Sequence, residues 1–599
     1  MRAGKATNRP RLSWIALASL LATSCILFLQ NIGTPNITTW DEVVHVNVVR
    51  NLAEHCCLPR LHRSGLGTDY RDWGNNALWL HKPLLPFYTT AAIYKLFGGS
   101  LWAFRLSGAI FALLTAVVIY LIGSKFLNDN IGLFAAAIFS LSPFTNALVH
   151  GKTYSGFPDL FFAFFVSVAL YLILDWTQSK SATTLRWLGF VVGLAYLCKG
   201  GLALAPFAVL AVIAILAGSI RDLIPALESI VVFAIIVLPE RLYWLAYHPV
   251  EAGYEQKQQL LHLFRNVEGH ASPWYFYFTN SLPHILVPAL VPFAYFSIGW
   301  ALTQCRPRTP GHSLSIWSLA YLVPLSFGVS KIDNFIFAVL PAVALLIPLA
   351  MESLMQSRQY SLVLSLCFGS LAMYILWQIA LSSRTIEGIV IWSRWSEHPY
   401  WLTFLAVIAI LAVALALWYL IKFDSKMVTS SVLSLTSVAL LLLYVHTNVL
   451  ENWIDTLQFN GLSTSAQVPL RQTGSDLRGL VDKNALIIVA LDDGRLEASL
   501  TGFFACGPGP EECVKRLASL YIMYWSDVDV LDVCREPQPQ KTVERFRGWK
   551  NAYLVTNDLL PALPLGRSPI GNVYSLRDIP FEVWSPVAIG ACQQSRTAL

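Results

Sequence analysis

The sequence predicts a mainly α-helical, polytopic membrane protein in which about thirteen transmembrane helices precede a small soluble domain of α/β type. Of its 599 residues, 55% are hydrophobic and only 13% are charged, and the mean hydropathy is +0.54. These values are far from those of soluble globular proteins. Long apolar runs recur up to residue 450, after which the composition becomes ordinary. We therefore divide the chain into a membrane part, residues 1–450, and a tail, residues 451–599.

Each predicted helix corresponds to an apolar run that can cross a hydrocarbon layer of about 30 Å at a rise of about 1.5 Å per residue. The first run, residues 14–29, is not followed by a typical small-residue cleavage site, so we expect a retained helix instead of a removed signal peptide. The predicted spans are centred on Ala18, Ala116, Ala137, Val166, Val191, Val209, Val232, Val287, Leu319, Val343, Ala372, Ile410 and Val438.

The distribution of cations between the spans predicts their orientation. Lysines and arginines precede the first span and then fall mostly in alternate breaks, which the positive-inside rule places in the cytoplasm together with the N-terminus. Residues 33–102 are cation-rich for an outer loop, but the rule applies to short loops. The outer loops are then residues 32–101, 150–159 and 246–280, and an odd number of spans puts the tail on the same outer side.

The tail combines Gly/Pro turns such as "CGPGPEEC" with strand-like runs such as "NALIIVAL" and "NAYLVT", which is typical of a mixed α/β domain. Its cysteines lie on the predicted oxidising side and favour one or two disulfides. They are Cys506, Cys513, Cys534 and Cys592. Their spacing does not match a zinc ribbon. The net charge of +6 is modest for this length and suggests no nucleic-acid partner.

Acidic residues follow the first span closely, in "NIGTPNITTWDEVVHVNVVRNLAEH", residues 31–55. Carboxylates beside a bilayer are costly unless they face water or a functional site. Asp41 and Glu42 therefore have two interpretations. They are solvated caps of the helix that follows, with Asp41 near its N-terminal dipole, or they belong to a site. This stretch alone does not decide between the two.

Further motifs favour a site. The set "WDE", "HKPLLPFY", "FGGSLWAFRL", "GFPDLFFAF", "LAYLCKGGLAL", "GHASPWYFY" and "SKIDNFIFAVLP" resembles the GT-C glycosyltransferases, multi-spanning enzymes that use polyprenyl-phosphate sugars. Within that group, the chain is most similar to the bacterial lipid A aminoarabinose transferases and the dolichyl-phosphate-mannose protein mannosyltransferases. Each motif is weak by itself, whereas the whole set in matching order is fairly specific.

The resemblance implies roles for three acidic residues. Transfer of a sugar from a lipid phosphate requires a base that prepares the acceptor hydroxyl and cations that hold the departing phosphate. Asp41 matches the family's catalytic acidic position, so we expect it to act as the general base, while Glu42 orients the loop. Asp159 matches a second acidic position that positions substrate or tunes Asp41. Its alternative interpretation is the N-cap of the fourth span.

The resemblance also implies a set of cations that bind the donor phosphate. Lys82 matches the family lysine with this role, to which a compact ammonium is suited. Its alternative is a side chain that snorkels to the membrane interface. Arg265 and Lys331 are further phosphate candidates, or else ordinary interfacial cations. Arg105 and Lys199 are motif residues of the same group, or else they mark helix ends.

Several positions depart from the family pattern. Related aminoarabinose transferases have glutamate, tyrosine and arginine where this chain has His81, Phe335 and Val44. Loss of the tyrosine and the arginine puts an aminoarabinose donor and a lipid A acceptor in doubt. His81, with His270 and Glu268, could supply a zinc site of the kind some relatives bind, since imidazole is a good zinc ligand. Scattered histidines more often form hydrogen bonds or stack, and we expect no obligatory cofactor.

The sequence therefore predicts an integral protein of a bacterial inner membrane, embedded among lipids, that transfers one sugar from a polyprenyl-phosphate donor to an acceptor hydroxyl on the outer face, with inversion. The sugar is not specified, and the acceptor is a lipid A-like lipid, a glycan or a protein. The alternative is a secondary transporter or lipid flippase, a class that usually has inverted repeats and polar residues at the membrane midplane. A third possibility is a noncatalytic scaffold.

Overall fold

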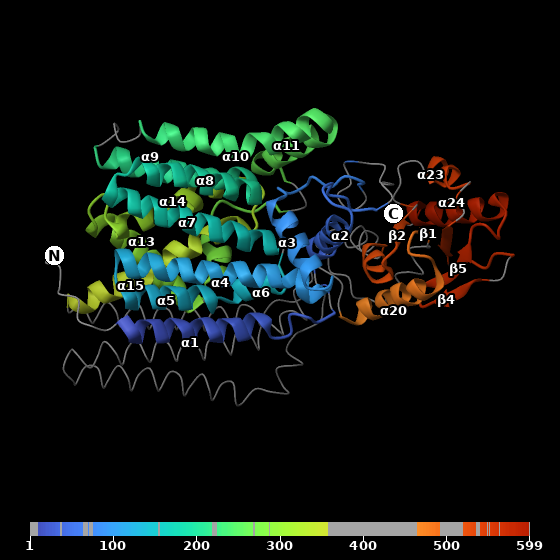
Figure 1. Ribbon diagram of the computed structural model, residues 1–599, viewed down its shortest axis with the longest axis horizontal. Helices are drawn as coiled ribbons and strands as arrows, with labels where there is room; N and C mark the ends of the chain where they lie inside the picture. The colour runs from blue at the N-terminus through green and yellow to red at the C-terminus, as the bar shows by residue number, and fades with distance from the viewer. Residues whose placement is uncertain are drawn as a thin grey trace.

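A bundle of long helices and, at one end of it, a sheet with its own helices make up this computed structural model (Figure 1). The described residues are 10–35, 37, 39–63, 70, 76–153, 156–218, 224–266, 270–286, 288–357, 464–490, 519–532, 534, 539–547, 549, 551–556, 558–561 and 564–597. The helices of the bundle and its loops are α1 (Pro10–Leu29), α2 (Trp40–Glu54), α3 (Leu85–Leu96), α4 (Leu101–Phe126), α5 (Asp129–Ser140), α6 (Pro143–Val149), α7 (Phe157–Ser179), α8 (Ala182–Lys199), α9 (Ala205–Leu216), α10 (Ala226–Tyr247), α11 (Pro249–Phe264), α12 (Leu282–Ile285), α13 (Val291–Gln304), α14 (Pro310–Ser326) and α15 (Leu340–Gln356). Shorter turns are η1 (Gly200–Leu204), η3 (Tyr277–Ser281), η4 (Pro288–Leu290) and η5 (Asp333–Val339).

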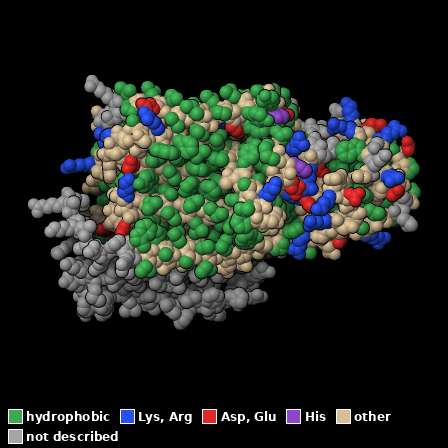
Figure 2. Space-filling model, in the orientation of Figure 1, with side chains coloured by type: hydrophobic (Ala, Val, Ile, Leu, Met, Phe, Trp, Pro, Cys, Tyr) green, Lys and Arg blue, Asp and Glu red, His purple; other side chains and the backbone are tan. Residues whose placement is uncertain are grey.

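Five helical segments in the described part of the chain are long and apolar enough to cross a membrane. They are Leu101–Phe126, Phe157–Ser179, Ala182–Leu216, Ala226–Tyr247 and Asp333–Gln356. A sixth span results if α5 and α6, which are bent by 55°, are counted together. Figure 2 shows apolar side chains over the broad face of the bundle and charged side chains mainly toward its two ends. This is an integral membrane protein.

The prediction of about thirteen spans is not confirmed by the described residues. The predicted centres Ala372, Ile410 and Val438 lie outside them. The two spans predicted around Val191 and Val209 form one apolar helical segment, Ala182–Leu216, which includes the 3-10 turn η1. Hydropathy alone did not separate one long interrupted helix from two spans.

The apolar run around position 287, itself outside the described residues, does not form the regular helix that was predicted. It is divided between η3, α12 and η4. Pro283 and Pro288 stand in these pieces, and Leu286 between them is extended. Proline lacks the N–H that a helix interior requires and disfavours the helical conformation in the residue before it. The prediction of a continuous span at this point was wrong for that reason.

Small residues allow the long helices to pack closely. Gly123 of α4 faces Gly132 of α5, and a Cβ added at either position would collide with the backbone of the other helix. Close approach of this kind is how membrane helices gain packing energy without a hydrophobic driving force between them. Through α4, this close pair of helices also contacts α2 and α7.

The described part of the tail contains a five-stranded mixed sheet in the order β2-β1-β3-β5-β4. Its strands are β1 (Leu486–Ala490), β2 (Asp529–Asp532), β3 (Ala552–Thr556), β4 (Gly566–Ser568) and β5 (Gly571–Ser575), and its helices are α20 (Thr464–Leu480), α23 (Pro539–Arg545) and α24 (Phe581–Thr597). β1 is parallel to β2 and β3, whereas β5 is antiparallel to β3 and β4. The runs "NALIIVAL" and "NAYLVT", from which strands were predicted, form β1 and β3.

Two disulfides lie in the described residues. Cys534 is bonded to Cys592, which fastens α24 to the segment after β2 and confirms that tail cysteines pair. Cys506 and Cys513 lie outside the described residues. The second disulfide joins the neighbouring residues 56 and 57 just after α2, a bond that the sequence did not lead us to expect.

Charged side chains fasten the tail to α2. Arg50 of α2 donates hydrogen bonds of 3.1 Å to the carbonyls of Met523 and Tyr524 and lies 3.5 Å from a carboxylate oxygen of Asp527. Arg63, in the loop after α2, donates to the same carboxylate at 2.6 Å. The sheet therefore lies at the end of the bundle that carries Asp41.

We expect this contact to weaken in acid. Burial by itself raises the pKa of Asp527, but the guanidiniums of Arg50 and Arg63 hold it below the ordinary value. A carboxylate with a depressed pKa stabilises the structure above its unfolded-state pKa, about 3.9, and this contribution is lost as the pH falls through the folded-state value. Hydrogen exchange of residues 519–526, corrected for intrinsic rates, should therefore increase below about pH 4. In Asp527→Asn it should already be fast and insensitive to acid, and an unchanged acid response in this variant would contradict the assignment.

Candidate active site

Asp41 and Lys82 form an ion pair at the end of the bundle near the tail. Asp41 lies in the first turn of α2, where the N-cap Thr39 accepts a hydrogen bond from the N–H of Glu42 and the helix dipole favours a carboxylate. Lys82 lies in the segment before α3, and its Nζ is 2.9 Å from Oδ1 of Asp41. Only 12% of the Asp41 side chain is exposed. Asp41 is thus a mostly buried partner of a cation instead of a solvated helix cap.

Glu42 is held by Arg105 in a buried bidentate ion pair. Nε of Arg105 lies 2.6 Å from Oε1 and Nη2 lies 3.1 Å from Oε2 of Glu42, while Nη1 donates to the carbonyls of Ile32 and Thr34. At Gly151, which has φ +70°, a Cβ would collide with the Glu42 carboxylate. Because the guanidinium is occupied in this way, we interpret Arg105 as a brace for the start of α2. The phosphate role that the motif implied for Arg105 stays a prediction.

Asp159 and Lys199 form a second buried ion pair. Asp159 lies in the first turn of α7, but the N-cap of that helix is Gly156, so the interpretation of Asp159 as an N-cap was wrong. Nδ2 of Asn334 in η5 donates to Oδ2 of Asp159 at 2.8 Å, and Nζ of Lys199 donates to the Asn334 carbonyl at 3.3 Å. Three elements that are distant in the sequence therefore meet at this carboxylate.

Lys199 connects the two ion pairs. Its ammonium interacts electrostatically with both Lys82 and Asp41, so it lies in the field of the first pair. The ring centroid of Phe335 lies 5.7 Å from Nζ of Lys199. Asp41, Lys82, Asp159 and Lys199 thus form one candidate site, built from α2, the segment before α3, α7 and the end of α8.

A neutral histidine lies beside Asp41. Nε2 of His45, one helical turn after Asp41, is 3.9 Å from its Oδ1. Three aromatic rings pack against the imidazole at centroid distances of 5.0 to 5.7 Å: Trp79, Phe87 and Phe157. Burial, followed by the charge of Lys82, lowers the pKa of His45 well below its usual value. The imidazole therefore adds no positive charge beside Asp41.

Lys331 and Arg265 lie in two segments that are hydrogen-bonded to each other, one before η5 and the other after α11. The N–H of Lys331 donates to the carbonyl of His270 at 2.9 Å, and its Nζ donates to the carbonyls of Ser272 and Gly328. Burial lowers the pKa of the Lys331 ammonium. The Arg265 side chain, at the end of α11, is exposed. No hydrogen bond or ion pair in the described part of the chain joins either cation to the α2 site, so their phosphate roles stay predictions.

The predicted zinc ligands are not assembled in the described residues. Nδ1 of His81 lies 3.4 Å from Oε2 of Glu255 in α11, and the carbonyl of His270 accepts a hydrogen bond from the N–H of Lys331. Glu268 lies outside the described residues. Among those that are described, no group of three histidine, cysteine, aspartate or glutamate side chains could hold a metal ion. Zinc binding stays a prediction.

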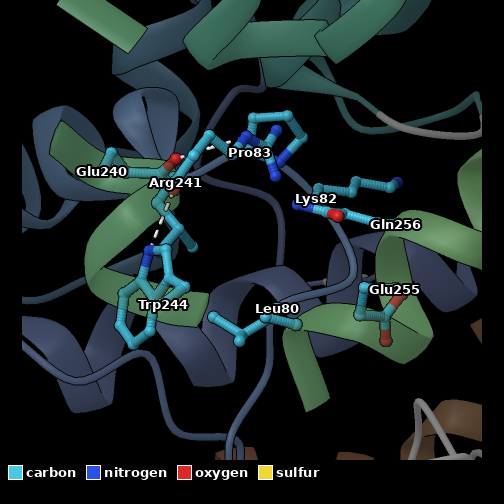
Figure 3. A pocket seen from close by; sticks show the side chains of 10 residues that line it. Leu80, Lys82, Pro83, Glu240, Arg241, Trp244, Glu255 and Gln256 are labelled. Carbon is cyan, nitrogen blue, oxygen red and sulfur yellow. Dashed lines mark hydrogen bonds and ion pairs between the residues drawn. The ribbon is translucent and has the colours of Figure 1, made fainter. Parts of the chain in front are cut away.

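A small cleft of about 20 Å³ lies beside Lys82, between the segment before α3, the end of α10 and α11 (Figure 3). It is lined by Leu80, Lys82, Pro83, Leu84, Glu240, Arg241, Trp244, Ala252, Glu255 and Gln256. Two cations and two acids thus share its wall. The cleft therefore brings charged side chains together beside the lysine that pairs with Asp41.

Sequence reasoning did not single out three of these polar residues. Asn334 stands in the motif "SKIDNFIFAVLP", from which only the lysine was selected. Arg241 lies in the apolar run of α10, and Glu255 lies in the amphipathic α11. An ionisable residue inside a membrane span is a functional candidate in its own right, and this signal could have identified Arg241.

Comparisons with known proteins find similar sequences among membrane-bound sugar transferases. The family model of the dolichyl-phosphate-mannose-protein mannosyltransferases matches residues 81–244. The chain is 29% identical over 288 residues to undecaprenyl phosphate-alpha-4-amino-4-deoxy-L-arabinose arabinosyl transferase 1 of Pseudomonas fluorescens, a match that covers 45% of this chain and 49% of the relative. The transferase of the same description from Pseudomonas savastanoi pv. phaseolicola is 27% identical over 353 residues, with 57% and 62% covered. The chain thus spans about half to three-fifths of the length of these relatives.

Solved structures extend the likeness over most of the chain. ArnT from Cupriavidus metallidurans bound to undecaprenyl phosphate superposes with a TM-score of 0.66 at 17% identity, over 94% of this chain and 98% of that one. The archaeal oligosaccharyltransferase AglB from Archaeoglobus fulgidus, in complex with an inhibitory peptide and a dolichol-phosphate, superposes with a TM-score of 0.50 at 13% identity, over 91% and 69%. At these identities, the likeness establishes the fold. The chain is a membrane protein with the GT-C glycosyltransferase fold, similar in sequence to transferases that use polyprenyl-phosphate sugars.

Proposed function

We propose that this protein transfers one sugar from a polyprenyl-phosphate donor to an acceptor hydroxyl at the outer face of the membrane. The observation that carries the proposal is the ion pair of Asp41 and Lys82, which stands next to a small cleft in a GT-C fold. The donor class is supported by relatives whose descriptions name undecaprenyl phosphate aminoarabinose as substrate. The sugar and the acceptor are left open.

The ion pair suggests how donor binding prepares the base. Without donor, Lys82 neutralises Asp41 at 2.9 Å. A phosphate competes with the carboxylate for the ammonium, because hydrogen bonds between charged partners are strong and phosphate offers several anionic oxygens. Asp41 is then released to accept the proton of the acceptor hydroxyl. Lys82 stabilises the charge that develops on the departing phosphate.

The ion pair between Asp159 and Lys199 supports a mechanism in which the acceptor hydroxyl is the only group that attacks the sugar. Lys199 and Asn334 hold Asp159, which therefore serves to position the site instead of forming a covalent intermediate. With one carboxylate acting as base and one acceptor hydroxyl attacking, the displacement inverts the anomeric carbon.

The disulfides favour the outer face for this chemistry. The bond between Cys56 and Cys57 lies just after α2, and that between Cys534 and Cys592 lies in the tail, which contacts α2. Disulfides persist in oxidising compartments such as the bacterial periplasm. We therefore propose that the site and the tail are periplasmic and that the N-terminus is cytoplasmic, in an inner membrane.

Turnover with a defined donor tests the proposal. Purified protein in lipid nanodiscs would be incubated with undecaprenyl-phosphate sugars of several classes and with lipid, glycan and peptide acceptors. We expect release of undecaprenyl phosphate and a mass increase of one sugar on one acceptor class, both measured by mass spectrometry. Donor binding without transfer to any acceptor would instead favour the alternative of a lipid flippase.

Lys82→Gln should weaken donor binding by about tenfold to a hundredfold, because it removes a charged hydrogen bond to the phosphate. The measurement is equilibrium binding of labelled undecaprenyl phosphate. Lys95→Gln provides the matched control, since Lys95 is an exposed lysine in the last turn of α3, and binding should stay unchanged. Equal affinities of Lys82→Gln and wild type, with both eluting as folded protein, would contradict a phosphate role for Lys82.

A further inference from the structure

His45 is a buried polar side chain whose Nε2 forms no hydrogen bond in the described part of the chain. The residue lies one helical turn after Asp41 in α2 and is only 1% exposed. Its Nε2 is buried and has no partner among the described residues. Oδ1 of Asp41 lies 3.9 Å from this nitrogen, which is longer than a hydrogen bond. Because native proteins rarely leave buried polar groups unpaired, this nitrogen requires an explanation.

Packing alone does not explain a histidine at this position. Trp79, Phe87 and Phe157 pack edge to face against the imidazole, with interplanar angles of 76° to 86°. An apolar ring makes the same kind of contact without burying an unpaired nitrogen. The nitrogen is therefore better explained by its place beside Asp41.

The imidazole is a hydrogen-bond donor toward Asp41. Burial, followed by the charge of Lys82, lowers the pKa of His45, so the ring is neutral and carries one N–H. A lone pair on Nε2 would oppose the negative Oδ1 at 3.9 Å, which favours the tautomer with the proton on Nε2. The structure thus places a neutral donor about 1 Å beyond hydrogen-bonding distance of the carboxylate.

Lys82 occupies the oxygen that His45 faces. Nζ of Lys82 donates to Oδ1 of Asp41 at 2.9 Å, and the same oxygen lies 3.9 Å from Nε2 of His45. In the proposed function, a donor phosphate competes for the ammonium and takes it away from the carboxylate. Oδ1 then loses a charged hydrogen bond, and a small rotation of the Asp41 side chain would bring it within about 3 Å of Nε2.

We propose that His45 is the positioning residue of the general base: when a donor phosphate engages Lys82, Nε2–H of His45 donates to Oδ1 of Asp41 and holds the carboxylate in place. The inference rests on the proposed function for the role of Asp41 and deepens it. Oδ2 takes the proton of the acceptor hydroxyl, while His45 stays neutral and transfers no proton. A neutral donor orients a carboxylate but lowers its basicity less than an adjacent cation does, so this exchange of partner favours proton transfer.

Unfolding of the full-length protein in detergent, titrated with sodium dodecyl sulfate, tests the exchange of partner without sugar transfer. Lys82→Met removes the ammonium and leaves no donor in its place, so Asp41 should bond to His45 in this variant. His45→Phe should then raise the unfolding equilibrium constant about tenfold more in Lys82→Met than in wild type, because a hydrogen bond to a charged group is lost only there. His45→Gln keeps an N–H at this position and should show little such coupling.

His62→Phe is the matched control. Nδ1 of His62 also lies 3.9 Å from a carboxylate oxygen, Oδ1 of Asp529, and both side chains are at most 5% exposed. This pair joins the loop after α2 to β2, so its replacement should raise the unfolding equilibrium constant equally in wild type and in Lys82→Met. Coupling of the same size in the control would show that Lys82→Met disturbs the fold generally, and would overturn the inference.

Steady-state transfer adds a readout that a purely structural role would not produce. With saturating donor, kcat of His45→Phe should fall about tenfold while KM for the donor stays within about twofold, and His45→Gln should recover most of the loss. An unchanged kcat in folded His45→Phe, or equal effects of His45→Phe on unfolding in both backgrounds, would contradict the inference. Coupling between His45 and Lys82 in a protein that never transfers sugar would instead refute the proposed function and leave the exchange of partner standing.

Discussion

Asp41→Asn is expected to lower sugar transfer by roughly 10²–10⁴-fold, the usual contribution of a positioned general base. The amide keeps the shape of the carboxylate but cannot accept the proton of the acceptor hydroxyl. Lys82 loses its anionic partner at the same time and becomes available to the donor, so binding of undecaprenyl phosphate should be kept or strengthened. The measurement is transfer of radiolabelled sugar from a polyprenyl-phosphate donor, together with donor affinity.

Asp175→Asn is the matched control for this variant. Asp175 also forms an ion pair with a lysine, Lys125, at 2.7 Å, but in the second half of α7. Its replacement removes a carboxylate of the same kind without touching α2, so turnover should stay unchanged. Full turnover of folded Asp41→Asn would remove the proposed base, whereas a matching loss in Asp175→Asn would point to a general loss of stability.

The motifs singled out Asp41 and Lys82 separately, and the structure adds the ion pair between them. Asp41 opens the helix that follows the apolar α1, and Lys82 precedes the proline-started α3, so both are placed by local helix boundaries that can be read in the sequence. The same holds for the strands β1 and β3, whose apolar β-branched runs form local patterns.

The sequence could not identify contacts between distant segments. Nothing in "FGGSLWAFRL" indicates that Arg105 reaches back to Glu42, and the motif implied only a phosphate contact or a helix end for this residue. The link between Asn334 and Asp159 joins positions 175 residues apart, which no periodicity reports. Arg241 was overlooked because averaged hydropathy hides one charge among apolar neighbours.

Arg105→Gln is expected to destabilise the protein by about 3–5 kcal/mol, because it leaves a buried carboxylate without its partner. Each side chain of the Glu42–Arg105 pair is only 2% exposed, so water cannot replace the lost hydrogen bonds. The free energy of unfolding, measured by titration with sodium dodecyl sulfate, should fall accordingly. Turnover should fall with it, since Glu42 sits next to Asp41 in α2.

Two further variants test whether the burial of the Glu42–Arg105 pair, and not merely the presence of an ion pair, accounts for the loss of stability. Arg186→Gln breaks a pair with the same 2.6 Å separation, but its side chains are 58% and 47% exposed, and exposed pairs contribute little to stability. The double variant Glu42→Gln with Arg105→Gln removes both buried charges, so its loss should be smaller than the sum of the single losses, which measures the coupling between them. Additive losses would mean that the two side chains stabilise α2 independently, which would contradict the interpretation of Arg105 as a brace that acts through Glu42.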